Sequence, residues 1–169
     1  MTLIDNDDLL ESVLTSLLIE IIDEVTIQIM EKLEEFIEDI VYDPYSPKVY
    51  PRQAEIGGLL NAWDVTKAVA SRNEVVAEIK DDPYSMAHDA GNFIHGSNYW
   101  VRKDIRNMLI DIVIKGLSGP IFDSENGDPW WKEPRDFWTP FVKLVESGKI
   151  NKMIERAFRS RGIKFKKIT

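Results

Sequence analysis

The sequence predicts an α+β fold with a long N-terminal helix, a small antiparallel sheet and C-terminal helices packed on the sheet. Two observations lead to this fold class. Through residues 1–41, apolar side chains recur at steps of three and four, which is the period of a helix. From residue 42 onward, the pattern changes to short β-branched segments, turns and helices with capping residues. We therefore expect a long acidic helix over residues 1–41 and a compact α+β domain over residues 42–169, together forming one structural unit.

The first helix is longer than a compact domain of this size requires. Asp5 or Asn6 can cap its start, and from Asn6 to Val41 it would measure about 54 Å at 1.5 Å per residue. Such a helix either packs part of its apolar stripe on a partner helix or crosses the whole sheet and projects beyond it. The acidic side chains expected on its solvent-facing side are Glu31, Glu34, Glu35, Glu38 and Asp39.

A tether rich in proline and tyrosine follows the helix, within residues 41–60. Its prolines end the helix near Val41, because proline lacks an amide hydrogen and clashes with the preceding helical turn. Its tyrosines offer large amphipathic contact surfaces. They are Tyr42, Tyr45 and Tyr50. Two alternatives remain open: the tyrosines pack on their own domain, or the tether docks on a neighbouring subunit.

The compact domain is expected to contain a hairpin, helices and a closing strand. A strand should begin within residues 59–63, and the β-branched segments 65–70 and 74–80 flank residues 71–73, which are typical of a turn. Three helices are expected from spacing and capping residues. They are Arg102–Lys115 closed by Gly116, a short helix capped by Thr139, and a terminal helix capped by Ser147 and closed by Gly162. Alternation over residues 163–166 predicts a last strand.

Charge is distributed unevenly along the chain, whose formal net charge is -8. Residues 1–41 hold twelve acids and one base, whereas residues 149–169 hold eight bases and one acid. Each end can form a solvated face, or the opposite charges can support head-to-tail packing of identical subunits. The basic C-terminal segment then faces either an acidic neighbour, which we favour, or DNA phosphates. Its residues are Arg159, Arg161, Lys164, Lys166 and Lys167.

The sequence contains few of the residues from which catalytic and metal sites are built. There is no cysteine, and the two histidines, His88 and His95, do not have the spacing of a zinc pair. The acids of the 123–128 loop do not match a calcium-binding loop. We therefore expect no enzymatic activity, no metal and no cofactor. The N-terminus lacks the pattern of a signal peptide, and acids interrupt every long apolar stretch, so we expect a soluble protein without a membrane partner.

Three stretches read together resemble a known family. They are VYDPYSPKVYPR with GGLLNAW within residues 41–63, DIRNMLIDIVIKGLSGPIF at 104–122, and PRDFWTPFVKLVESGKINKMIERAFRSRGI at 134–163. They are similar to minor tail or neck proteins of long-tailed bacteriophages, the tail-completion, tail-terminator or head–tail connector components. The resemblance implies an α+β fold with a long N-terminal helix, assembly into a ring and no enzymatic activity.

The resemblance implies a structural protein of the virion, assembled in the host cytoplasm, whose ring joins head and tail around the DNA channel. The expected partners are further copies of the chain in a six- or twelve-fold ring, other neck, connector or tail-tube proteins, and genomic DNA in non-specific contact. The expected subunit interface comprises Leu18, Ile22, Ile29, Tyr42, Tyr45, Tyr50 and Arg52. Two alternatives from other classes are a nucleic-acid-binding regulator that uses the basic C-terminal segment and a hydrolase that uses Asp and His within residues 84–128.

Overall fold

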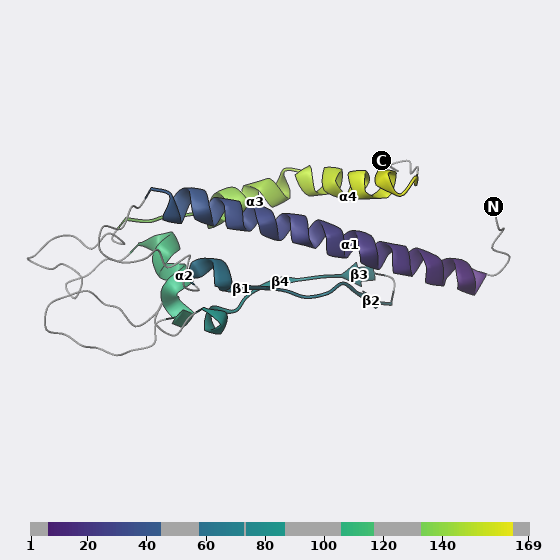
Figure 1. The fold of residues 1–169 in the computed structure, drawn as a ribbon, viewed down its shortest axis with the longest axis horizontal. Coiled ribbons are helices and arrows are strands. Elements are labelled where there is room, and N and C mark those ends of the chain that lie inside the picture. The colour runs from purple at the N-terminus through teal and green to yellow at the C-terminus, as the bar shows by residue number, and fades with distance from the viewer. Residues whose placement is uncertain (1–6, 45–57, 73, 87–105, 117–132, 164–169) are drawn as a thin grey trace, which may run out of the picture. The chain divides into compact units, whose positions relative to one another are not determined.

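The computed structural model describes residues 7–44, 58–72, 74–86, 106–116 and 133–163 (Figure 1). These residues form a mixed α+β fold that is mostly helical, which confirms the predicted fold class. The helices are α1 (Asp7–Ile37), α2 (Arg106–Lys115), α3 (Trp138–Glu146) and α4 (Lys149–Ser160). The strands are β1 (Trp63–Val65), β2 (Val69–Ser71), β3 (Glu74–Val76) and β4 (Ile79–Asp81).

Helix α1 matches the predicted long helix, with a difference at its C-terminal end. The regular α-helix stops at Ile37, and one turn of π-helix, Glu38–Tyr42, carries the chain to the point where the prolines begin. The amide of Asp43 closes this wider turn by donating to the carbonyl of Glu38, at 2.8 Å. The predicted end of the helix near Val41 is therefore confirmed, although its last turn is wider than that of an α-helix.

The predicted hairpin is present as the antiparallel pair β2 and β3, in which Val69 lies opposite Val76. Each predicted strand is interrupted, however, so that β1 and β4 form a second two-stranded sheet. The interruption has a local cause at Thr66, whose side-chain oxygen accepts the amide of Glu78 at 2.9 Å. Beside it, the amide of Ala68 donates to the Asp23 carboxylate of α1 at 2.6 Å, so it is not available for strand pairing.

The chain divides into two compact units, and α1 supplies residues to both. Unit 1 consists of Met1–Glu31, Val65–Ile79 and Leu144–Thr169. Unit 2 consists of Lys32–Asp64 and Lys80–Lys143. Each unit combines part of α1 with segments from later in the chain.

The core of unit 1 lies between α1 and α4, which run side by side (Figure 1). Its fully buried side chains are Ile21, Val25 and Ala157, each at most 2% exposed. Partly buried apolar residues of both helices surround them: Leu17, Ile29, Ile150, Met153, Ile154 and Phe158. This packing confirms the stripe predicted for the terminal helix. Each large side chain that is fully buried contributes about 1.5–3 kcal/mol relative to exposure, so the contact between α1 and α4 stabilises unit 1.

The core of unit 2 contains the C-terminal part of α1 and the aromatic residues near α3. Its largest fully buried side chains are Leu33, Ile37, Met86 and Phe137. Trp63 stacks on Trp138 with ring centroids 5.6 Å apart and meets Phe137 edge-on at 6.2 Å. Phe137 is therefore part of this core, whereas Trp138 is 38% exposed and packs at its edge. Trp130 and Trp131 lie outside the described residues.

Two predicted helix caps are wrong, and in each case a neighbouring residue replaces the predicted one. Helix α3 begins at Trp138, one residue before the predicted cap Thr139, because the Asp136 carboxylate accepts the Thr139 amide at 2.9 Å. Hydrogen bonds from the side chain and from the backbone amide of Thr139 lower the pKa of Asp136. Ser147 does not cap α4, because its hydroxyl donates to the carbonyl of Leu144 at 2.6 Å and so ends α3. Gly148, with a φ of 74°, makes the turn into α4 instead.

Gly162 closes α4 in the left-handed conformation, with a φ of +75°, and the Ile163 amide donates to the Phe158 carbonyl at 3.1 Å. A Cβ added at Gly162 would meet nothing within 4 Å, so substitution there tests backbone strain alone. We predict that Gly162→Val lowers the free energy of unfolding by about 1–3 kcal/mol. Gly162→Asn should cost less, because Asn tolerates left-handed geometry. Denaturant unfolding of both variants checks this, and equal stability of the two would contradict it.

Candidate interaction surfaces

The first turns of α1 expose a row of large apolar side chains, which we call the α1 apolar face. Its residues are 37–53% exposed and recur at helical spacing. They are Leu9, Leu10, Val13, Leu14 and Leu18. In Figure 1, α1 runs beyond the ends of α4 and of the β2–β3 hairpin in this region. The prediction that the apolar stripe exceeds what one domain covers is therefore met within unit 1.

The β2–β3 hairpin exposes a second, smaller apolar surface in the same unit. Val69 and Val76 are cross-strand partners, and they are 60% and 36% exposed. The hairpin has only two strands, and a two-stranded sheet is marginally stable in water by itself. Asp23 fixes it to α1 through the Ala68 amide, which leaves the valine pair uncovered.

The interface residues predicted on α1 do not share one environment. Leu18 belongs to the α1 apolar face and is exposed. Ile22 is partly exposed, whereas Ile29 packs against the core of unit 1. Of these three residues, only Leu18 is exposed, at 37%. The more exposed apolar side chains of α1 lie in the turns that precede Leu18.

Tyr42, the first tyrosine of the predicted tether, packs inside unit 2 and is 8% exposed. Its hydroxyl oxygen accepts the Leu59 amide at 2.8 Å. Burial raises the pKa of Tyr42 to about 12 despite this hydrogen bond, because ionisation would place a charge in an apolar surrounding. Two alternatives were open for the tyrosines, and Tyr42 follows the first, because it packs on its own domain. The other predicted tether residues, Tyr45, Tyr50 and Arg52, lie outside the described part of the chain.

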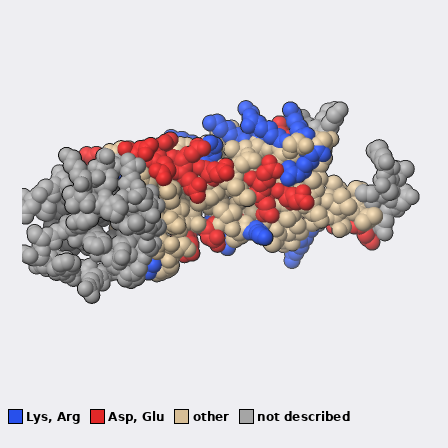
Figure 2. Space-filling model, in the orientation of Figure 1, with Lys and Arg blue, Asp and Glu red and all other residues tan. Residues whose placement is uncertain are grey.

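The outer side of α4 carries a straight row of cations, which we call the α4 basic stripe. Its residues are exposed and follow one another at steps of three, four and three. They are Lys149, Lys152, Arg156 and Arg159. Figure 2 shows Lys and Arg side chains gathered over α4 and acidic side chains along α1. Arg159 lies 3.9 Å from Glu155, whereas the other three cations form no ion pair within the described residues.

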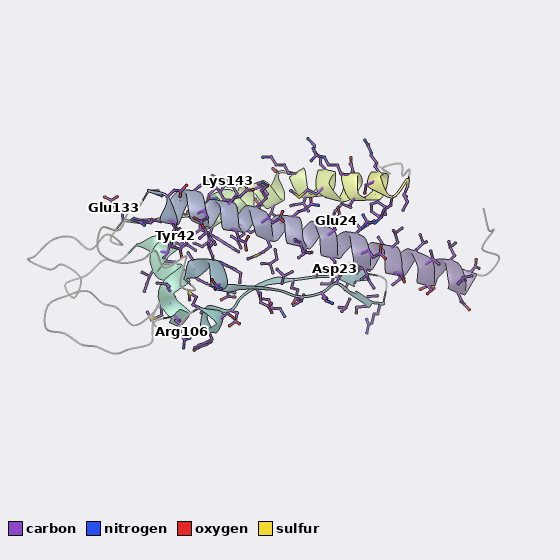
Figure 3. All side chains as sticks on the ribbon, viewed as in Figure 1. Asp23, Glu24, Tyr42, Arg106, Glu133 and Lys143 are labelled. Atoms are coloured by element: carbon purple, nitrogen blue, oxygen red, sulfur yellow. The ribbon has the colours of Figure 1, made fainter. Side chains whose placement is uncertain are left out.

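Arg161, predicted to face a neighbour or DNA, instead binds α1 of its own chain. Its guanidinium lies 2.8 Å from the Glu24 carboxylate and 4.0 Å from that of Glu20. Glu24 therefore holds α4 while the adjacent Asp23 holds the hairpin, and Figure 3 labels both residues. Some of the opposite charges of the two chain ends thus pair with each other inside unit 1. The remaining predicted cations, Lys164, Lys166 and Lys167, lie outside the described residues.

Two arginines that the sequence analysis did not single out have structural roles in unit 2. Arg135 donates to the Val41 carbonyl at 2.8 Å, and its own amide donates to the Val113 carbonyl at 2.8 Å. Arg106 (Figure 3) donates to the Met86 carbonyl at 3.1 Å and lies over the Tyr84 ring. No local pattern marks these residues, because their partners are distant in sequence.

The described residues contain no group of three or more His, Cys, Asp or Glu side chains that could hold a metal ion. Both histidines and the acids of the 123–128 loop lie outside them. Among the described helices, none has both the length and the apolar character needed to cross a membrane. The described residues present three surfaces: the α1 apolar face, the Val69–Val76 pair and the α4 basic stripe.

The model of the YomN family, a phage-derived protein family, matches residues 6–160. No curated protein and no solved structure matches the chain. The matched range includes nearly all of the described residues and all three surfaces.

The buried hydroxyl of Tyr42 predicts a pH dependence of stability. The unfolded chain releases this proton near pH 10 and the folded chain near pH 12. The stabilisation is thus complete below pH 10 and is lost between pH 10 and pH 12, by about 1.4 kcal/mol per pH unit. Unfolding of Tyr42→Phe should show a shallower alkaline decline, although losing the acceptor of the Leu59 amide costs about 1–3 kcal/mol at neutral pH. Tyr84→Phe, at a 64% exposed site, is the control. An equally steep decline in Tyr42→Phe would refute this assignment.

Proposed function

Because the chain belongs to the YomN family, which is phage-derived, we propose that it is a non-enzymatic structural component of a tailed-phage virion. In this proposal, copies of the chain form a ring at the neck or tail-completion position, where head and tail join around the DNA channel. Its neighbours are other neck, connector or tail-tube proteins, and it is assembled in the host cytoplasm. The proposal includes no cofactor and no catalytic step.

The α1 apolar face is the observation that carries the proposal. A monomer gains nothing from five large apolar side chains in a continuous row on the surface, since each exposed side chain forgoes the free energy of burial. Contiguous apolar patches on soluble domains mark interaction sites more often than isolated exposed residues do. A structural subunit that is covered by its neighbours accounts for this row without requiring a pocket or a reactive side chain.

A second copy of the chain is the occupant that we propose for this face. A ring is built by heterologous contacts, in which one surface of each subunit meets a different surface of the next. Unit 1 offers two separate apolar surfaces of this kind, the α1 apolar face and the exposed pair Val69 and Val76. Joining them would also cover the two-stranded hairpin, which gains stability when a third element packs on it.

The alternative function, a regulator that binds specific nucleic-acid sequences, is less well supported by the arrangement of α4. Reading a sequence requires contacts with base edges, typically bidentate hydrogen bonds from a helix that enters the major groove. Three of the four stripe residues form no ion pair within the described residues, and their row of like charges suits phosphates, which carry no sequence information. Cationic contacts of this type are compatible with a structural protein beside DNA.

Substitution on the α1 apolar face tests the proposal better than truncation does. Removing residues 1–40 would delete Ile21, Val25, Leu33 and Ile37, which are buried in the two cores, and would therefore unfold the chain. We predict that Leu10→Glu/Leu14→Glu lowers the native mass from oligomer to monomer, because two charges on the face cannot be buried in a contact. The melting temperature should change by less than a few degrees, because both side chains are exposed.

The matched control is Ser12→Glu/Ser16→Glu, which adds the same charge to the same turns at two exposed polar positions. It should assemble as the wild type does. The measurement is native mass over a range of chain concentrations. A wild-type chain that remains monomeric at all concentrations and in the presence of phage particles lacking it would contradict the proposal. So would an oligomer that the leucine variant leaves intact.

A further inference from the structure

We propose that the α4 basic stripe binds the phosphate backbone of nucleic acid without regard to sequence. This inference deepens the proposed function, because it names a partner and the surface that meets it. It depends on unit 1 of a single chain and does not require a ring. The DNA-binding inference and the proposed ring can therefore be supported or contradicted independently.

The geometry of the stripe suits a polyanion. From Lys149 to Arg159 the helix rises about 15 Å, which equals the axial length of about four base pairs of duplex DNA. Over this distance one strand presents about four or five phosphates, a number close to that of the four cations. Because the steps of three, four and three keep all four on one side of the helix, they can contact one strand at the same time.

The stripe is free to bind because the opposite side of α4 holds the helix in place. Ile150, Met153, Ile154, Ala157 and Phe158 pack against α1, and Arg161 fixes the C-terminal end through Glu24. The cations themselves point to solvent. Glu155, the acid of α4, is 3.9 Å from Arg159, and an exposed pair at this distance contributes little. Binding a phosphate thus breaks no strong contact within the described chain.

An acidic protein surface fits the stripe less well than phosphates do. The centre of a protein–protein interface is enriched in aromatic residues and depleted in Lys, whereas α4 exposes no large apolar side chain among its described residues. Contact with nucleic acid gains its free energy from the release of counterions and needs no apolar burial. The sequence analysis favoured an acidic neighbour because both chain ends are highly charged. The structure places Arg161 against Glu24 of the same chain, which reduces the charge available to such a neighbour.

The test is binding of the full chain to labelled duplex DNA, measured by fluorescence anisotropy over a range of salt concentrations. For the wild type we expect log K to fall with log salt with a slope of about -3, equally for unrelated sequences, because three or four phosphates are contacted. Lys152→Gln/Arg156→Gln should reduce the slope by about 2 and the affinity by at least tenfold at low salt. The control Lys67→Gln/Arg72→Gln removes one Lys and one Arg from exposed positions of the hairpin region and should leave the slope nearly unchanged.

Three outcomes would overturn the inference. The first is that the wild type does not bind DNA at low salt. The second is that the control variant weakens binding as much as the stripe variant does. The third is that poly-glutamate or anionic vesicles compete with labelled DNA as strongly as unlabelled DNA does, which would assign the stripe to an acidic protein or a membrane. The native mass and the melting temperature of the stripe variant show whether it still assembles and folds, so a loss of DNA binding can be told apart from a loss of assembly. A folded variant that still forms oligomers but has lost DNA binding supports both proposals.

Discussion

One constraint organises the described structure: a single helix, α1, must fill two cores. Ile21 and Val25 are buried in unit 1, whereas Leu33 and Ile37 are buried in unit 2. In unit 1 the acids of the helix are also structural, because Asp23 accepts the Ala68 amide and Glu24 pairs with Arg161. From about Leu17 onward, both apolar and acidic residues of α1 are therefore required for contacts within the chain. The turns before Leu17 are free of this requirement, and they carry Leu9, Leu10, Val13 and Leu14, four of the five residues of the α1 apolar face.

Local signals were sufficient to predict the elements whose cause lies within a few residues. The 3.6-residue period identified α1, α2 and α4, the turn at residues 71–73 identified the hairpin, and the glycine at 162 identified the end of α4. Which of two nearby polar residues caps a helix could not be predicted in the same way. Asp136 and Thr139 can each start α3, and the carboxylate prevails as the acceptor of the amide.

The candidate surfaces could be predicted only in part, because exposure depends on what the rest of the chain covers. The long apolar stripe of α1 and the basic character of α4 were visible in the sequence. Which part of that stripe is covered and which is exposed was not visible, because α4, which covers part of it, is more than a hundred residues away in the sequence. Tyr42 illustrates the same limit. Its position beside prolines left open whether it packs on its own domain or on a neighbour, and the structure shows it enclosed by the amide of Leu59 and the apolar residues of unit 2.

Amide hydrogen exchange along α1 tests the central claim most directly, because it reports on each turn of the helix separately. The account predicts that, in the dissociated chain, amides of residues 8–16 exchange rapidly and those of residues 21–41 exchange slowly. On assembly, residues 8–16 should gain protection while residues 21–41 remain unchanged. Protection of residues 8–16 that is already high in the dissociated chain, or that does not increase on assembly, would contradict the claim that a second copy covers the first turns of α1.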